Sequence, residues 1–157
     1  MQRSGWRITG STTGKIAWFL WSASQNGSIA VSMVDGMVDD IFEHPRLVAI
    51  YDALDPDRSD LDVYARLARE LGASQVLDVG CGTGTFALLL ADRGFDVIGL
   101  DPAGGSLIVA QAKPGADGVR WIHGDATSLP PMQVDLATMT ANVAQAIVDQ
   151  AEWEETL

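Results

Sequence analysis

Residues 75–84 read Gln-Val-Leu-Asp-Val-Gly-Cys-Gly-Thr-Gly, a short apolar run that leads into three glycines at alternate positions. The apolar run predicts a strand over 75–79, because parallel strands are covered on both faces and are almost continuously apolar. The glycines predict a sharp turn whose backbone can approach a ligand closely. A helix expected directly after the turn, over 85–93, would direct unpaired N–H groups at that ligand. The segment therefore predicts a site for a nucleotide-like cofactor.

The sequence on both sides of this segment alternates strands with helices. Further strands are predicted at 96–100, 119–123 and 134–139. Further helices are predicted at 45–54 with Pro45 in its first turn, from a capping Ser59 or Asp60 to 71, and, more weakly, around 107–112 with Gly104 and Gly105 in its first turn. This alternation predicts an α/β fold with a Rossmann-like, doubly wound parallel sheet of about four strands.

The composition describes one acidic globular domain. The 157 residues are 47% hydrophobic and carry 10 Lys+Arg against 21 Asp+Glu, a formal charge of −11. Such a charge repels phosphate backbones, so nucleic acid is not an expected partner. The single cysteine, Cys81, cannot form an internal disulfide, and no recognised ligand spacing joins it to His44 or His123 in a metal site. These features predict no metal and a cytoplasmic location.

The first 36 residues differ from the rest of the chain. They hold three basic residues and one acidic residue, together with three of the five tryptophans. Residues 10–15 are one position short of a phosphate loop, and Ile16 stands where a magnesium-binding Ser or Thr is required. The apolar run at 16–21 resembles a short secretory signal and falls well below the length of a membrane span. We interpret residues 1–36 as a poorly ordered or non-native extension of a domain over 37–157.

Asp101 narrows the type of cofactor. It ends the second predicted strand, 17 residues after Gly84, where a carboxylate can accept hydrogen bonds from both ribose hydroxyls. Nicotinamide-dependent dehydrogenases share this plan, but their fingerprint requires glycine at the position of Thr85. An NAD-linked enzyme is therefore kept only as an alternative hypothesis.

The glycine-rich segment resembles the first motif of the class I S-adenosylmethionine-dependent methyltransferases, residue for residue from Leu77 to Gly84. Residues 124–130, Gly-Asp-Ala-Thr-Ser-Leu-Pro, are similar to the family's segment after the third strand, and 134–136, Val-Asp-Leu, to its fourth strand. The resemblance covers about residues 51–140. It implies S-adenosyl-L-methionine as the cofactor and methyl transfer as the reaction. The sequence lacks the family's motifs for nucleic-acid amino groups and cytosine C5, which leaves a small-molecule acceptor.

The resemblance also implies which residues bind the cofactor. Its methionine and ribose portions would lie over Gly80, Gly82 and Gly84, with Cys81 in the same turn as a small filler. Asp78 would reach the amino group of the cofactor, directly or through water, and Asp101 would hold the ribose.

Three further segments are implied to complete the cofactor site. Asp125 and the backbone N–H of Ala126 would meet the adenine, between apolar walls from Pro102 and Leu129. Tyr51, next to Asp52, would belong to an N-terminal lid, and Thr140 to the loop after the fourth strand. No catalytic residue is nominated.

The end of the chain carries a separate expectation. The resemblance implies a seven-stranded sheet, whereas four strands are predicted here. A helix that begins near Asp149 would have barely two turns before Leu157. We therefore expect a C-terminally truncated, marginally stable domain with an apolar strand edge at 134–139 that is open to self-association. Two functions remain open, which are methyl transfer and a cofactor-binding remnant without turnover.

Overall fold

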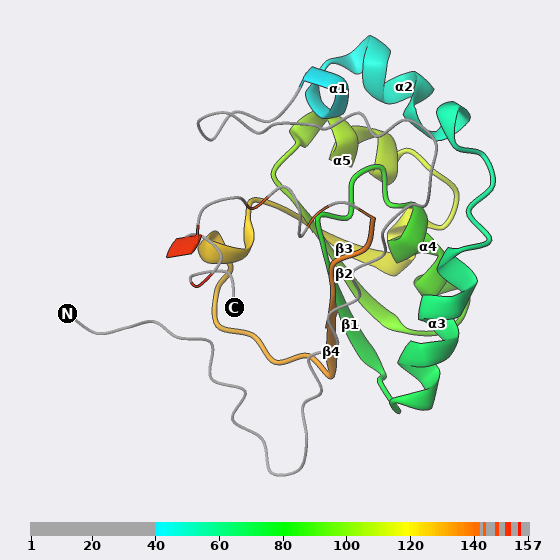
Figure 1. Ribbon diagram of the computed structural model, residues 1–157, viewed down its shortest axis with the longest axis vertical. Coiled ribbons are helices and arrows are strands. Elements are labelled where there is room, and N and C mark those ends of the chain that lie inside the picture. The colour runs from blue at the N-terminus through cyan, green and yellow to red at the C-terminus, as the bar shows by residue number, and fades with distance from the viewer. Residues whose placement is uncertain (1–39, 142, 144–146, 148–149, 152–153, 155–157) are drawn as a thin grey trace.

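The computed structural model describes residues 40–141, 143, 147, 150, 151 and 154 (Figure 1). The extension at 1–36 and most of the helix expected at 149–157 lie outside the described residues. The elements are, in order, α1 (Asp40–Glu43), α2 (Pro45–Leu54), α3 (Leu61–Glu70), β1 (Gln75–Val79), α4 (Thr85–Asp92), β2 (Asp96–Asp101), α5 (Gly104–Gln111), η1 (Ala116–Gly118), β3 (Val119–His123), η2 (Ala126–Ser128) and β4 (Leu136–Thr138). No helix among them is long and apolar enough to cross a membrane.

The four strands form one all-parallel sheet in the order β3-β2-β1-β4, which confirms the predicted fold class. The chain builds outward from β1 to β3 on one side and then returns to place β4 on the other side of β1. Such a reversal of strand order opens a crevice at the carboxyl ends of the strands, where ligands bind in open α/β sheets. The glycine-rich turn follows β1 directly and so lies at this crevice (Figure 1).

The two faces of the sheet are packed by different parts of the chain. On one face, apolar side chains of α3 and α4 surround inward residues of all four strands, with Leu61, Ala65, Phe86 and Leu90 almost fully buried. On the other face, a smaller cluster joins β1 and β2 to the segment that follows β3. Because side chains alternate along a strand, Asp78 shares the helix-covered face with Val76, and Asp101 shares it with Val97.

Helix α1, which the sequence did not predict, packs on the amino-terminal end of α5. The Glu43 Oε2 atom accepts a hydrogen bond from the Gly105 N–H at 3.0 Å, and Ser106 Oγ donates to the Phe42 carbonyl at 2.8 Å. A Cβ at position 105 would overlap the Glu43 backbone, so this contact requires glycine.

Most element bounds were predicted correctly, and the corrections have local causes. The fourth strand covers only Leu136–Thr138, the three residues that pair with residues 76–78 of β1, rather than the predicted 134–139. Helix α5 begins at Gly104 rather than near 107. Asp60 precedes α3 as predicted but makes no capping hydrogen bond, since its carboxylate accepts from Arg58 Nε at 3.2 Å instead.

Candidate cofactor site

The glycine-rich turn is held against β2 by its own backbone. The N–H groups of Gly80 and Cys81 both donate to the Leu100 carbonyl, at 2.8 and 3.0 Å. Gly80, Gly82 and Gly84 have φ values of +70°, +54° and +80°, which side chains rarely adopt. The pattern of alternate glycines is therefore what allows this turn to form between β1 and α4.

Two of these glycines also make room for protein side chains. The indole of Trp121 lies against Gly84, where a Cβ would come within 2.5 Å of it, and against Gly99. A Cβ at Gly80 would overlap the side chain of Val143. Close packing within the protein thus accounts for Gly84, a use that the motif alone did not indicate.

Cys81 packs beneath the turn. Its side chain is buried, and its sulfur lies 3.1 Å from where a Cβ of Gly99 would stand. Burial raises the pKa of the thiol well above its usual range, and the nearby Asp78 and Asp101 raise it further. The side chain is a core filler, and contact of Cys81 with a cofactor stays a prediction.

Asp101 links the turn to the segment that follows β2. One carboxylate oxygen accepts from the Gly82 N–H at 2.7 Å and the other from the Ala103 N–H at 2.8 Å, in a side chain only 7% exposed. Burial raises the pKa of Asp101, although both hydrogen bonds and the neighbouring His123 oppose that rise. Each carboxylate oxygen has two lone pairs, so these contacts leave acceptor capacity for hydroxyl groups.

Asp78 is fully buried and only half satisfied. Its Oδ1 accepts from Thr138 Oγ1 at 3.0 Å, while Oδ2 has no hydrogen-bond partner within the described part of the chain. Burial raises the pKa of Asp78 to about 7, with the Thr138 hydrogen bond opposing the rise and the charge of Asp101 adding to it. An unpaired buried carboxylate oxygen is costly, and such a group invites a donor from a ligand.

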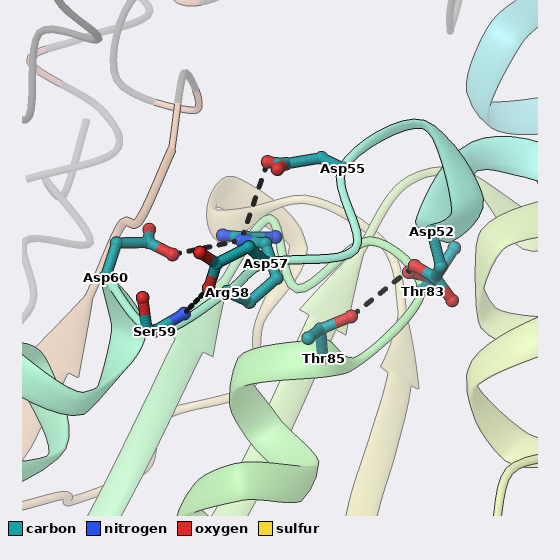
Figure 2. A network of polar contacts seen from close by, with 8 residues as sticks. All are labelled: Asp52, Asp55, Asp57, Arg58, Ser59, Asp60, Thr83 and Thr85. Atoms are coloured by element: carbon teal, nitrogen blue, oxygen red, sulfur yellow. Dashed lines mark hydrogen bonds and ion pairs between the residues drawn. The ribbon is translucent and has the colours of Figure 1, made fainter.

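Tyr51 and Arg58 border the same end of the sheet. Tyr51 packs its ring 5.4 Å from that of Phe42, and burial raises its pKa, with Arg58 lowering it and Asp101 among the groups that raise it. Arg58 pairs with Asp60 at 3.2 Å and with Asp55 at 3.8 Å (Figure 2). Its charge also lowers the pKa of Asp78, so Arg58 acts on the site although no sequence pattern pointed to it.

The remaining predicted residues lie in the segments that follow the carboxyl ends of β2, β3 and β4, with Ala126 in η2. Asp125 caps η2 by accepting from the Ser128 N–H at 2.8 Å. Hydrogen bonds from Thr127 and Ser128 lower its pKa, and Thr127 contributes most. The other four are an exposed Pro102, a buried Ala126, a half-buried Leu129 and a buried Thr140.

The model of a family described as "Methyltransferase domain" matches residues 76–157, just over half of the chain. The chain belongs to this methyltransferase domain family. The similar proteins found with it are class I S-adenosylmethionine-dependent methyltransferases. This confirms the family resemblance stated from the sequence.

Individual relatives agree with this assignment. The methyltransferase domain is 45% identical over 56 residues to the ubiquinone biosynthesis O-methyltransferase of Azorhizobium caulinodans, covering 36% of this chain and 22% of the relative. It is 41% identical over 68 residues to the demethylmenaquinone methyltransferase of Thermus thermophilus, covering 41% of this chain and 31% of the relative. The chain thus spans less than a third of the length of these two curated relatives.

A solved structure shares the fold. The S-adenosylmethionine-bound amino pentose methyltransferase CalS10 of Micromonospora echinaspora superposes with a TM-score of 0.59 at 27% identity, over 68% of this chain and 48% of that one.

The methyltransferase domain fits the cofactor of its family. S-Adenosylmethionine carries an ammonium group, and the unpaired Oδ2 atom of Asp78 is a buried acceptor without a donor in the described part of the chain. Its ribose hydroxyls need acceptors, and the Asp101 carboxylate lies at the end of the adjacent strand. The donor and acceptor chemistry of the site therefore matches the group.

Proposed function

We propose that this chain binds S-adenosyl-L-methionine at the carboxyl ends of β1, β2 and β3 and transfers its methyl group to a small-molecule acceptor. The observation that carries the proposal is the Asp78 Oδ2 atom, fully buried and unpartnered among the described residues, beside a glycine-rich turn. A buried carboxylate in this state is retained at a cost to stability, which is typical of a functional site.

The proposed contacts follow from the charges around the turn. Asp78 accepts from the cofactor's ammonium group, and Arg58 provides the positive charge for its carboxylate. Asp101 accepts from the ribose hydroxyls through its remaining lone pairs. Asp125 and the N–H of Ala126 face the adenine at the end of β3.

Methyl transfer requires few reactive side chains from the protein. The sulfonium of the bound cofactor makes its methyl group electrophilic, so the contribution of the protein is orientation and exclusion of water. The turn, Asp101 and Tyr51 provide that orientation, because each is fixed by contacts within the fold. We assign no catalytic base.

The setting of the protein is part of the proposal. The formal charge of −11 supports a small-molecule acceptor rather than a nucleic acid, and the single cysteine supports a cytoplasmic location. We further propose that residues 37–157 form the domain and that copies can associate through the outer edge of β4, which has β1 as its one partner among the described strands.

Calorimetric titration with S-adenosylhomocysteine tests the cofactor site. The wild-type chain should bind saturably, and Asp101→Ala should weaken binding at least about tenfold, because hydrogen bonds to a charged group contribute about 1.5–3 kcal/mol. Asp117→Asn, at an exposed acid of η1, is the matched control and should bind like the wild type. A folded wild-type chain that binds no S-adenosylhomocysteine would refute the proposal.

A second measurement separates turnover from binding. Radiolabelled methyl transfer to a panel of hydroxyl- and amine-bearing small molecules should yield labelled product if the chain is active. Binding without transfer to any acceptor would instead support the cofactor-binding remnant.

A further inference from the structure

One carboxylate joins three separate elements beside the glycine-rich turn. Asp52, on α2, accepts from Thr83 Oγ1 at 2.5 Å and from Thr85 Oγ1 at 3.5 Å, as Figure 2 shows. It also pairs with Lys113 Nζ at 2.5 Å. Thr83 lies in the turn, Thr85 begins α4, and Lys113 follows α5. Asp52 therefore connects α2 to the carboxyl end of the sheet, where the proposed cofactor site lies.

Thr83 is the residue through which Asp52 acts on the turn. It stands between Gly82 and Gly84, both in left-handed backbone conformations, and it is only 4% exposed. The turn's other non-glycine side chain, Cys81, packs inward against β2. The inner side of the turn is thus held by Leu100 and Asp101, and the outer side by Asp52.

The ion pair with Lys113 favours the ionised form of Asp52. Partial burial raises the pKa of Asp52, but the hydrogen bonds from Lys113 and Thr83 outweigh that effect and lower it overall. An ionised acceptor makes the stronger hydrogen bond to a hydroxyl. The ion pair also ties α2 to the end of α5, the helix that follows Asp101.

We propose that Asp52 is a positioning residue for cofactor binding, which holds the glycine-rich turn in its binding conformation through Thr83. The inference rests on the proposed function, because it concerns the same cofactor site. Asp52 does not touch the cofactor in this scheme. Its effect passes through Thr83, and docking of α2 and binding of the cofactor therefore favour one another.

Three single variants, one double variant and one control test the role in the full 157-residue chain. Asp52→Asn removes the charge, Thr83→Val removes the hydroxyl, and Thr83→Ser restores a hydroxyl. Each of the first two should weaken S-adenosylhomocysteine binding about tenfold, as expected for a lost charge-assisted hydrogen bond. Thr83→Ser should bind like the wild type, and so should the control Asp117→Asn.

The double variant distinguishes positioning from general damage. If Asp52 acts through Thr83, the combined change Asp52→Asn with Thr83→Val should weaken binding no more than either single change. Additive losses, or equal binding by the wild type and both single variants, would overturn the proposal. Should Asp52→Asn fail to fold by circular dichroism, the Thr83→Val and Thr83→Ser pair carries the test. Loss of binding in both of these would also refute the role of the hydroxyl.

A measurement without ligand separates this inference from the proposed function. Asp52→Asn should accelerate hydrogen exchange of the amides at 80–84 in the ligand-free chain, whereas Asp117→Asn should not. If the wild-type chain binds no S-adenosylhomocysteine, the proposed function fails, and unchanged exchange at 80–84 would overturn the positioning role on its own evidence.

Discussion

The free energy of unfolding of the wild-type, ligand-free protein should fall as the pH rises, in part because of Asp78. The variant Asp78→Asn should lack that part of the fall. Burial raises the pKa of Asp78 to about 7, whereas an unfolded aspartate titrates near about 3.9. Between these values the folded protein binds more protons than the unfolded chain, so the free energy of unfolding falls as pH increases. The contribution is fully present below about pH 3.9 and is lost as the pH rises through about 7.

The size of the effect follows from the width of that window. A difference of about three pKa units at about 1.4 kcal/mol each corresponds to about 4 kcal/mol. This is a large share of the roughly 5–15 kcal/mol by which domains are stable. An asparagine side chain cannot ionise, so the stability of the Asp78→Asn variant should not include this decline.

Urea unfolding followed by circular dichroism, from about pH 5 to about pH 8, measures the part of this decline that falls between about pH 5 and about pH 7, which is about two pKa units or about 3 kcal/mol. The difference between wild type and Asp78→Asn reports the titration of Asp78, because groups that do not interact with Asp78 titrate alike in the two proteins. As a control, Asp135→Asn should lower stability by a constant amount over this range. Hydrogen bonds from the Gln75 and Ser74 N–H groups lower the pKa of Asp135, which therefore stays ionised throughout. Parallel curves for the wild type and Asp78→Asn would refute the reasoning.

Three further predictions concern packing. Gly105→Ala should detach α1 and speed hydrogen exchange of the amide at position 105, because the added Cβ overlaps the Glu43 backbone. The control Gly104→Ala should leave this exchange unchanged, because its Cβ would have no neighbour closer than 3.4 Å. Leu90→Ala should cost about 2–5 kcal/mol in urea unfolding, and Ile108→Ala, at a side chain 70% exposed, less than about 0.5 kcal/mol. Cys81 should react with a thiol reagent far more slowly in the folded protein than in urea, and equal rates would contradict its burial.

The sequence predicted those parts of the fold and site that depend on neighbouring residues. The run of apolar residues before alternate glycines located β1, the turn and α4, because strand burial and positive φ impose those residue types locally. Asp78 and Asp101 could be named because each lies at the carboxyl end of a recognisable strand.

Other features required the tertiary structure. Thr138 reaches Asp78 across 60 residues of sequence, and Asp52 reaches Thr83 across 31, so no local pattern links the partners. Arg58 lies in a turn whose sequence gives no sign that its charge acts on Asp78. Helix α1 has four residues and is defined by its packing on α5 rather than by its own periodicity.

The position of Trp121 gives the protein an optical reporter of its own site. The indole lies against both Gly84 and Gly99 while its Nε1 donates to the Ala116 carbonyl at 2.9 Å, so it sits between the turn and the sheet. With the other four tryptophans replaced by phenylalanine, its emission would come from this single place. Any rearrangement of the turn would then change the wavelength and polarisation of that light, without an added dye.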